Sequence, residues 1–377
     1  MTNYHKKEFL QKIITCVLLL VYIVSICSNV FAIGIANDGL AIQYIYDGGG
    51  EYLQFSVKKA ADGRYAYCLE HKKSVPTGQD YYTSGEMGKG LTYILQNGFP
   101  NVSFTGDNNK DYYITQAAVH YYLGEVQWIT IPGMNDPSGL LPHIMNLVNG
   151  ARNAESSNFN NTSIDLSEKN AKFVLNNNYY ETPEISCTYV GNLTGYTVSL
   201  ENAPSGMEIV SLSGNVTNSF SAGEKFKLRI ATSNVKADYS VKVNVTGNFN
   251  VKTSMLYVTT NQNYQSMAML EAKTVVTKNL ASLVANLDPV GSIKIIKKDK
   301  QTGKLINGTT FNITNNNGYN STINVNGEIT ISNLKLGNYV ITEVQANPNY
   351  VIDKTPIQVT VEAAKVKTVN FENIYKT

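Results

Sequence analysis

The sequence predicts a mainly β protein with a mixed α/β domain near the N-terminus, followed by two β-sandwich domains. Three observations predict this order. Short runs rich in β-branched and aromatic residues, bounded by Gly, Asn and Ser, recur along most of the chain. Three helical patterns are confined to residues 84–152. Beyond residue 183 the runs stay short and no long helical pattern follows, which is typical of β-sandwiches. The predicted domains are therefore 33–182, 183–288 and 289–377.

Residues 1–32 are expected to be a secretory signal peptide. Charged residues precede the apolar run IITCVLLLVYIVSIC, and SNVFA ends in a V-x-A cleavage pattern after Ala32. The run is shorter than the roughly 20 apolar residues that a membrane-spanning helix needs. We therefore predict secretion with no membrane association after cleavage; an uncleaved membrane anchor is the alternative.

Charge and cysteine content limit the classes of function. The mature chain is charge-balanced once the three lysines and one glutamate of the signal are removed, which argues against a nucleic acid or an anionic membrane as partner. The signal contains Cys16 and Cys27, so the mature chain keeps only Cys68 and Cys187. At most one disulfide can form, although small secreted domains often depend on several. The residues indicate no cofactor and no metal site.

The first domain mixes predicted strands and helices. Its strands are expected at 40–46, 52–57 and 64–70. Its helices are expected at 84–99, 111–124 and 137–152. Asp111 and Gly124 would cap the second helix, and Pro142 would disturb the start of the third. The Asn- and Ser-rich segment 154–172 predicts a surface loop.

The two later domains are predicted to be all β. Strands of the middle domain are expected at 186–191, 195–201, 225–232, 239–247 and 254–260. Strands of the last domain are expected at 291–299, 309–314, 327–334, 337–344, 356–361 and 366–375. The middle domain shows no catalytic constellation, so we expect it to act as a spacer.

Cys68 lies in the Tyr-rich strand RYAYCLE with no second cysteine near it. From the residues alone, three interpretations stay open. Cys68 is a buried apolar residue, a disulfide partner of Cys187, or a nucleophile that needs a base or an electrophile. A catalytic pair with His71 or His120 is conceivable, although no cysteine-protease signature surrounds Cys68.

Two motifs together resemble the thioester domain of Gram-positive surface adhesins. They are YCL at Tyr67–Leu69 and TQAAVH at Thr115–His120, and the resemblance covers residues 33–180. It implies that the first motif lies on a strand and the second opens a helix. It also implies that the Cys68 sulfur and the side-chain carbonyl carbon of Gln116 join as an internal thioester.

This chain departs from the family at His120, where the family usually has Trp. Gln116, His120 and Leu123 recur at i, i+4 and i+7 and so share one helix face. His120 is therefore expected near the thioester. There it would influence hydrolysis of the thioester, or it would simply take the place of the aromatic side chain that lines the site in the family.

The implied chemistry is a single-use reaction rather than turnover. Contact between the thiolate and the carboxamide makes the attack intramolecular, which lowers the barrier by as much as ~7–11 kcal/mol. Loss of ammonia then makes the step effectively irreversible. A lysine amine of a host protein would attack the acyl group of Gln116 and expel Cys68 as thiolate, which leaves an amide bond between the two proteins.

Residues 290–377 resemble the B-type repeat of collagen-binding adhesins, a small inverse immunoglobulin-like sandwich. The matching segments are GSIKIIKKDKQTGKLINGTTFNI, GNYVITEVQANPNY and VKTVNFENIY. The resemblance implies an isopeptide bond between Lys294 of the first strand and Asn373 of the last, promoted by a buried Glu343. Burial disfavours the charged forms of lysine and glutamate, so a neutral amine would attack while a protonated Glu343 polarises the Asn373 carbonyl.

Periodicity and resemblance disagree on the lysine of this bond. Lys297 shares a strand face with Ile293 and Ile295, whereas Lys294 shares one with Ile296. Periodicity alone therefore favours Lys297 slightly, while the family alignment indicates Lys294.

Together these features predict a secreted, cell-surface adhesin of a Gram-positive bacterium, with a thioester head, a spacer and an isopeptide-stabilised monomeric stalk. The expected partner is a host extracellular or cell-surface protein bearing a reactive lysine. The alternatives are a non-covalent surface or pilus subunit and, third, a secreted Cys hydrolase. The sequence ends at FENIYKT without a sorting motif, so we expect either a fragment of a longer anchored protein or attachment to the wall by another route.

Overall fold

The computed structural model describes residues 32–46, 52–126, 134–157, 159–279 and 282–377. Of the predicted signal peptide, all but Ala32 lies outside these residues. The chain is mainly β, as predicted. It forms two compact units, each made of two segments of the chain. The first unit contains the chain up to Asn161 together with Asn250–Thr274, and the second contains Thr162–Phe249 and Val275–Thr377. The three predicted domain boundaries stay a prediction.

The first unit contains a closed ring of six strands. These are β1 (Ile33–Tyr46), β2 (Tyr52–Ala60), β3 (Tyr65–Cys68), β4 (Thr77–Glu86) and the parts of β14 (Tyr239–Val258) and β15 (Met267–Lys278) that belong to this unit. Pairing runs β14–β15–β3–β2–β1–β4, and β4 pairs back onto β14 from Met255↔Glu86 to Val258↔Tyr82. Closure leaves no free sheet edge and gives the ring an interior face.

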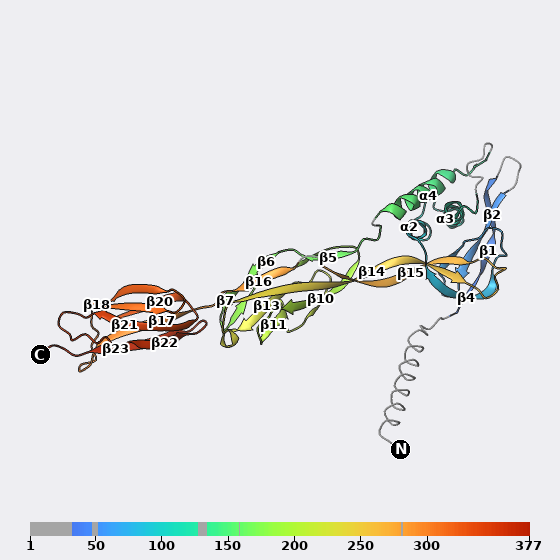
Figure 1. Ribbon diagram of the computed structural model, residues 1–377. Helices are drawn as coiled ribbons and strands as arrows, with labels where there is room; N and C mark the ends of the chain where they lie inside the picture. The colour runs from blue at the N-terminus through green and yellow to red at the C-terminus, as the bar shows by residue number, and fades with distance from the viewer. Residues whose placement is uncertain (1–31, 47–51, 127–133, 158, 280–281) are drawn as a thin grey trace, which may run out of the picture. The chain divides into compact units, whose positions relative to one another are not determined.

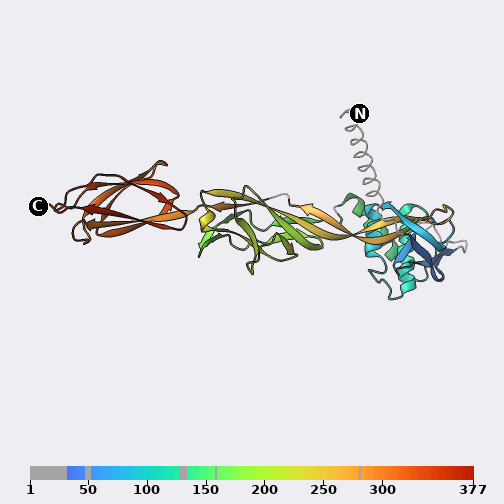
Figure 2. The same ribbon diagram turned by 90° about the horizontal axis from the view of Figure 1, so that it is seen from below.

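The hairpin of β14 and β15 differs from the prediction. The sequence predicts two separate strands at 239–247 and 254–260, yet β14 is one strand of 20 residues, and β15 was not predicted. The polar segment after Gly247 continues the strand because its backbone groups are paired with neighbouring strands (Figures 1 and 2). Residues 250–274 therefore pack with the first unit.

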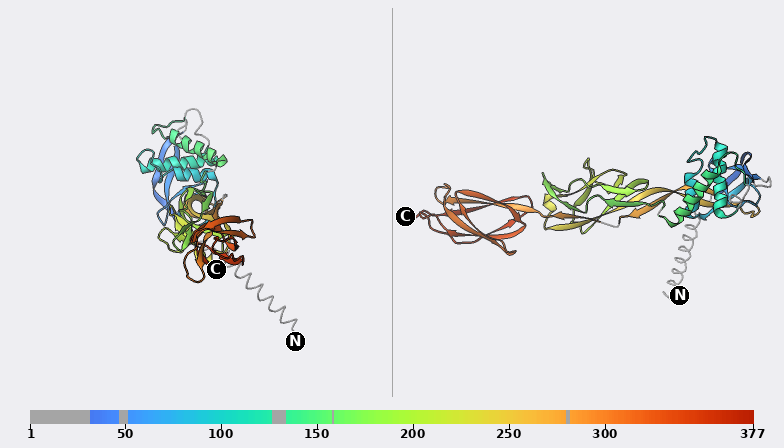
Figure 3. Two further views of the ribbon diagram at one scale, coloured as in Figure 1. Left: turned by 90° about the vertical axis from the view of Figure 1, so that its left-hand side faces the viewer. Right: turned by 90° about the horizontal axis from the view of Figure 1, so that it is seen from above.

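Three helices cover one side of the ring (Figures 1 and 3). They are α2 (Lys89–Asn97), α3 (Asn108–Leu123) and α4 (Leu141–Ser156). Their apolar faces share one core with Leu53, Phe55 and Val57 of β2. Gly150 lets α4 approach α2, since a Cβ there would lie 2.2 Å from the Tyr93 ring. All three helices were predicted in these regions, but α3 begins earlier than expected and Asp107 caps it instead of Asp111.

The second unit begins with a β-sandwich. Its strands are β5 (Ser163–Leu166), β6 (Asn170–Lys172), β7 (Val174–Asn176), β8 (Tyr179–Glu181), β9 (Cys187–Val190), β10 (Leu193–Glu201), β11 (Met207–Ser211), β12 (Ser219–Ser221), β13 (Phe226–Ala231), β16 (Leu283–Leu287) and the first part of β14. One sheet has the order β11-β13-β8-β7, and β10 pairs with β12 and β14 in the other. The segment 154–172, predicted as a loop, contains β5 and β6.

The C-terminal sandwich contains two sheets, one of three strands and one of four. The sheets face each other (Figure 2). They are β17 (Val290–Asp299), β18 (Thr309–Asn315), β19 (Asn320–Val325), β20 (Glu328–Lys335), β21 (Gly337–Gln345), β22 (Ile357–Val361) and β23 (Val366–Asn373). The first and last strands, β17 and β23, run parallel and side by side in the sheet β20-β17-β23. Each predicted strand of this domain is present.

Within the described ranges, none of the helices is long and apolar enough to cross a membrane.

Candidate functional site

Strand β3 places Cys68 inside the ring. The strand pairs with β2 on one side and with β15 on the other, where Met267 lies opposite Cys68. Alternation along β3 directs Tyr67 toward the helices, and its ring stacks on Tyr112 with centroids 5.0 Å apart. Cys68 therefore points to the interior face, where it is 5% exposed.

The TQAAVH motif does not open the helix, as the resemblance implied: Gln116 lies in the middle of α3, which is capped at both ends. The Asp107 side chain accepts hydrogen bonds from the backbone N–H groups of Asn109 and Lys110. Gly124 ends the helix with a φ of 78°, which glycine adopts without strain. The Gln116 side chain is 1% exposed and points from the helix to the ring.

The Gln116 carboxamide lies directly against Cys68. The Cys68 N–H donates to Gln116 Oε1 at 2.8 Å, and Gln116 Nε2 donates to the Cys68 carbonyl oxygen at 2.8 Å. The Tyr112 hydroxyl lies 3.5 Å from the same Oε1 and donates to the Ala66 carbonyl at 2.8 Å. The carboxamide is thus fixed against the backbone of Cys68, and its oxygen faces a backbone N–H that can stabilise an oxyanion.

A cavity of about 280 Å³ lies beside this pair. Besides Cys68 and Gln116, its lining includes Lys58, His120 and Gln265. Gln265 comes from the segment just before β15, so it reaches the cavity from a distant part of the sequence. Its backbone carbonyl accepts a hydrogen bond from Tyr81 at 2.8 Å, while its buried side-chain Oε1 has no partner among the described residues.

His120 occupies one wall of the cavity. Its ring stacks on Phe55 with centroids 5.3 Å apart and meets His71 edge-on at 5.5 Å. Burial lowers the pKa of His120 to about 3, and the charges of His71 and Lys58 act in the same direction. The imidazole is therefore neutral at physiological pH, and its buried Nδ1 has no hydrogen-bond partner among the described residues.

Lys58 and Gln265 were not predicted as part of the site. Lys58 is 1% exposed, and its Nζ donates to the Ser56 carbonyl at 2.7 Å and to Ser56 Oγ at 2.8 Å. Burial lowers the pKa of Lys58 and raises the pKa of Cys68 to about 12. The charge of each group partly opposes the shift of the other, because Cys68 raises the pKa of Lys58 and Lys58 lowers the pKa of Cys68. The alternation of polar and apolar residues in β2 places Lys58 on the polar face of the strand, but the same pattern is equally typical of a face exposed to solvent. It therefore does not identify Lys58 as a site residue.

A second buried polar set lies in the C-terminal sandwich. Lys297 of β17 and Glu343 of β21 are fully buried, and Asn373 of β23 is 2% exposed. Lys297 Nζ lies 2.9 Å from Glu343 Oε2, and Asn373 Nδ2 donates to Glu343 Oε1 at 2.7 Å. Burial lowers the pKa of Lys297, although the Glu343 carboxylate opposes this shift. Asn373 Oδ1 has no partner in the described part of the chain.

The structure corrects the choice of Lys294. Its Nζ pairs with Glu328 Oε1 at 3.0 Å on the outer face, with 31% of the side chain exposed. Residues 293, 295 and 297 of β17 point inward, because side chains alternate along a strand. Lys297, which periodicity favoured, therefore occupies the position next to Glu343 and Asn373.

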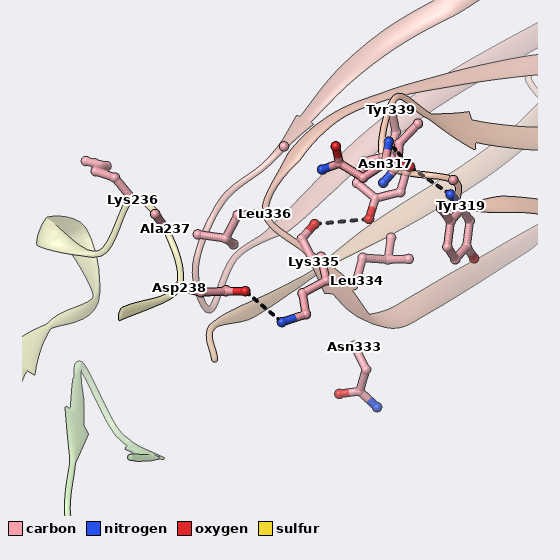
Figure 4. Close-up of a pocket in the computed structure, with 13 residues that line it drawn as sticks. Lys236, Ala237, Asp238, Asn317, Tyr319, Asn333, Leu334, Lys335, Leu336 and Tyr339 are labelled. Atoms are coloured by element: carbon pink, nitrogen blue, oxygen red, sulfur yellow. Dashed lines mark hydrogen bonds and ion pairs between the residues drawn. The ribbon is translucent and has the colours of Figure 1, made fainter. Parts of the chain in front are cut away.

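The other candidate features of the described residues are the two cysteines, possible metal ligands and a second cavity. Cys68 and Cys187 are both free cysteines. The described residues contain no group of three or more His, Cys, Asp or Glu side chains that could hold a metal ion. A larger cavity of about 860 Å³ lies in the second unit, and several of the residues that line it are paired with one another (Figure 4). In it Lys335 pairs with Asp238 at 2.9 Å and the Tyr339 hydroxyl donates to the Lys335 carbonyl at 3.1 Å.

Two family models match the chain. Residues 65–153 match the thioester domain, and residues 291–375 match the SpaA prealbumin-like fold domain. A search of curated proteins found no match.

Two solved structures share the fold. The Bacillus anthracis TIE protein is 22% identical, with a TM-score of 0.67 over 91% of this chain and 65% of that one. The thioester domain of the Enterococcus faecium TIE86 protein is 17% identical, with a TM-score of 0.51 over 67% of this chain and 95% of that one. This chain thus spans just under two thirds of the Bacillus anthracis chain.

The fold brings Cys68 and Gln116, from the two motifs found in the sequence, together in one buried site of a mainly β chain. The matches to the thioester domain over residues 65–153 and to the SpaA prealbumin-like fold domain over residues 291–375 agree with both resemblances drawn from the sequence.

Proposed function

We propose that this protein is a secreted adhesin on the surface of a Gram-positive bacterium. It attaches covalently to a lysine of a host extracellular or cell-surface protein through an internal thioester between Cys68 and Gln116. The observation that carries the proposal is the reciprocal pair of 2.8 Å hydrogen bonds between the Gln116 carboxamide and the Cys68 backbone. The match of this region to the thioester domain supports the same chemistry.

The bond forms when the Cys68 sulfur attacks the side-chain carbonyl carbon of Gln116. Negative charge develops on Oε1, where the Cys68 N–H is already 2.8 Å away. The C–N bond then breaks and Nε2 leaves as ammonia. An incoming amine later attacks the same carbon and expels the Cys68 thiolate, which forms the amide bond to the ligand. Burial protects the acyl group from water until a ligand amine enters the cavity.

The C-terminal sandwich is proposed to carry an isopeptide bond between Lys297 and Asn373. The Lys297 amine attacks the Asn373 side-chain carbonyl carbon, and Nδ2 leaves as ammonia. Glu343 touches both partners, which supports its role as the acid that polarises the amide and passes protons between them. Because the bond ties the adjacent first and last strands β17 and β23, it would hold the domain closed under pulling force.

A turnover hydrolase is the less favoured function. In a hydrolase of the Cys–His type the histidine would be the general base, and the pKa of about 3 at His120 is far below the range in which a general base works well at neutral pH. A non-covalent pilus subunit would lack the amine reaction altogether, so the same experiment separates it from the adhesin.

The test is reaction of the mature chain with methylamine, followed by peptide mapping. Wild type and Cys187→Ala should both acquire methylamine on Gln116, because Cys187 lies in the other unit. Cys68→Ala should acquire none, and it should also fail to capture host extracellular proteins covalently. Labelling of Gln116 in Cys68→Ala would exclude the thioester, and absence of labelling in wild type would favour the non-covalent subunit.

A further inference from the structure

We propose that Lys58 is the proton carrier of the thioester reaction, taking the proton of the Cys68 thiol and delivering it to the ammonia that leaves Gln116. This inference rests on the proposed thioester and assigns the proton transfer that the thioester itself does not explain.

Register places Lys58 next to Cys68 on the interior face of the ring. Lys58 pairs with Ala66 across β2 and β3, and Cys68 follows Ala66 by two positions on the same face. Lys58 and Cys68 are therefore diagonal neighbours, a separation that a long side chain spans. The hydrogen bonds from Nζ to Ser56 turn the amine along the strand toward the level of Cys68, and both side chains line the same cavity.

The surroundings of Lys58 suit an amine better than an ammonium ion. Within the described ranges, Nζ forms no ion pair, and its two hydrogen bonds go to the neutral carbonyl and hydroxyl oxygens of Ser56. A neutral amine has two N–H groups for these acceptors and keeps a lone pair free, whereas an ammonium ion would leave a buried charge uncompensated. Burial lowers the pKa of Lys58 accordingly.

Cys68 needs such a base. Burial raises the pKa of its thiol to about 12, so very little thiolate forms unaided at neutral pH. Two other side chains of the cavity are weaker candidates. The pKa of His120 is about 3, and that of His71 is also lowered, mainly by burial. The ordinary pKa from which burial lowers the amine is also higher, 10.5 for Lys58 against 6.5 for each imidazole.

The Lys58 amine accepts the thiol proton, which gives a thiolate and an ammonium group. The thiolate adds to the carbonyl carbon of Gln116, and the oxyanion at Oε1 is held by the Cys68 N–H. When the C–N bond breaks, the Lys58 ammonium gives its proton to Nε2, ammonia leaves, and the amine is restored. In ligand capture the proton of the attacking amine passes through Lys58 to the expelled thiolate.

The experiment follows intact mass at successive times after cell-free synthesis of the mature chain, using four variants. Lys58→Met keeps the apolar stem, Lys58→Gln keeps a donor for Ser56, and Lys58→Arg keeps a positive charge that cannot be released. Lys59→Met is the matched control, because the neighbouring lysine is partly exposed and pairs with Asp38. Circular dichroism establishes that each variant is folded, and Lys58→Gln provides the same test if Lys58→Met does not fold.

Wild type and Lys59→Met should lose the Cys68–Gln116 ammonia at the same rate. All three Lys58 variants should lose it at least about 100-fold more slowly, the usual contribution of positioned proton transfer. Wild-type speed in Lys58→Met or Lys58→Gln would overturn the inference and leave the thioester intact. Wild-type speed in Lys58→Arg would also overturn it, since a fixed charge would then suffice. No ammonia loss at this site in wild type would remove the proposed function and this inference together.

Discussion

Replacement of Lys297 by Met is expected to weaken the C-terminal sandwich strongly. The substitution removes the amine that lies 2.9 Å from Glu343 while keeping an apolar stem in the core. A bond between residues 297 and 373 closes a loop of about 77 residues, for which the chain-entropy relation gives about 4.5 kcal/mol at 25 °C. For a domain of this size each kcal/mol corresponds to about 4–8 °C, so the melting temperature should fall by about 20 °C or more.

The assay is scanning calorimetry of the mature chain together with intact mass. Lys294→Met is the matched control, since it makes the same change three positions away on the same strand. Lys294 is partly exposed and pairs with Glu328 only at the surface, where an ion pair contributes about 0–1 kcal/mol. Lys294→Met should therefore keep both the melting temperature and the mass of the crosslinked wild type, whereas Lys297→Met should regain one ammonia.

The crosslink effect would be contradicted by a Lys297→Met variant that melts within a few degrees of Lys294→Met while its mass shows the ammonia regained. That result would mean that the crosslink restricts the unfolded chain far less than the loop length predicts. Loss of the isopeptide bond in Lys294→Met would instead restore the assignment made from the family alignment.

Three further predictions concern the thioester domain. After methylamine has opened the thioester, the rate of alkylation of Cys68 in the native protein should be low at pH 7.5 and rise about tenfold per pH unit up to pH 10. The reason is that the pKa of Cys68 is about 12, so the thiolate fraction grows tenfold per pH unit over this range. A plateau of the rate near pH 9 would contradict this. His120 has a pKa of about 3 when folded, against about 6.5 when unfolded, so the folded state binds fewer protons and loses stability as pH falls from 6.5 toward 3. His120→Phe should lose less stability than wild type between pH 7 and pH 4 in urea unfolding, and equal losses would refute the assignment. Tyr112→Phe should destabilise by about 2–4 kcal/mol in the same assay, because the backbone N–H of Lys58 and the carbonyl of Ala66 both lose their partner; a change below about 0.5 kcal/mol would show that water replaces it.

Local sequence patterns predicted the position of a side chain correctly where that position depends only on the residue's own strand or helix. The alternation GSIKIIKKD places Lys297 on the inner face, and the structure agrees with that periodicity rather than with the family alignment that indicated Lys294. Gly124 ends α3 as expected, since a left-handed residue there is favoured as glycine. Asp111 failed as a cap because its carboxylate is buried and accepts hydrogen bonds from Ser103 and Thr105.

The missing parts of the site depend on closure of the sheet. Ser56 and Lys58 alternate with Phe55 and Val57, which predicts a strand whose polar face is exposed to solvent. Closure of the ring turns that face inward, and only the pairing of β4 with β14 closes it. Gln265 likewise enters the cavity through the pairing of β15 with β3, a contact between residues about 200 positions apart that no local pattern encodes.

The mass of the purified mature chain reports on both proposed bonds at once, because each of them expels one ammonia. Wild type should weigh two ammonias less than its sequence demands. Cys68→Ala and Lys297→Met should each weigh one ammonia less than their own sequences, and the double variant should match its sequence. A wild-type mass equal to the sequence mass would contradict both bonds, and a deficit of two ammonias in Cys68→Ala would contradict the thioester alone.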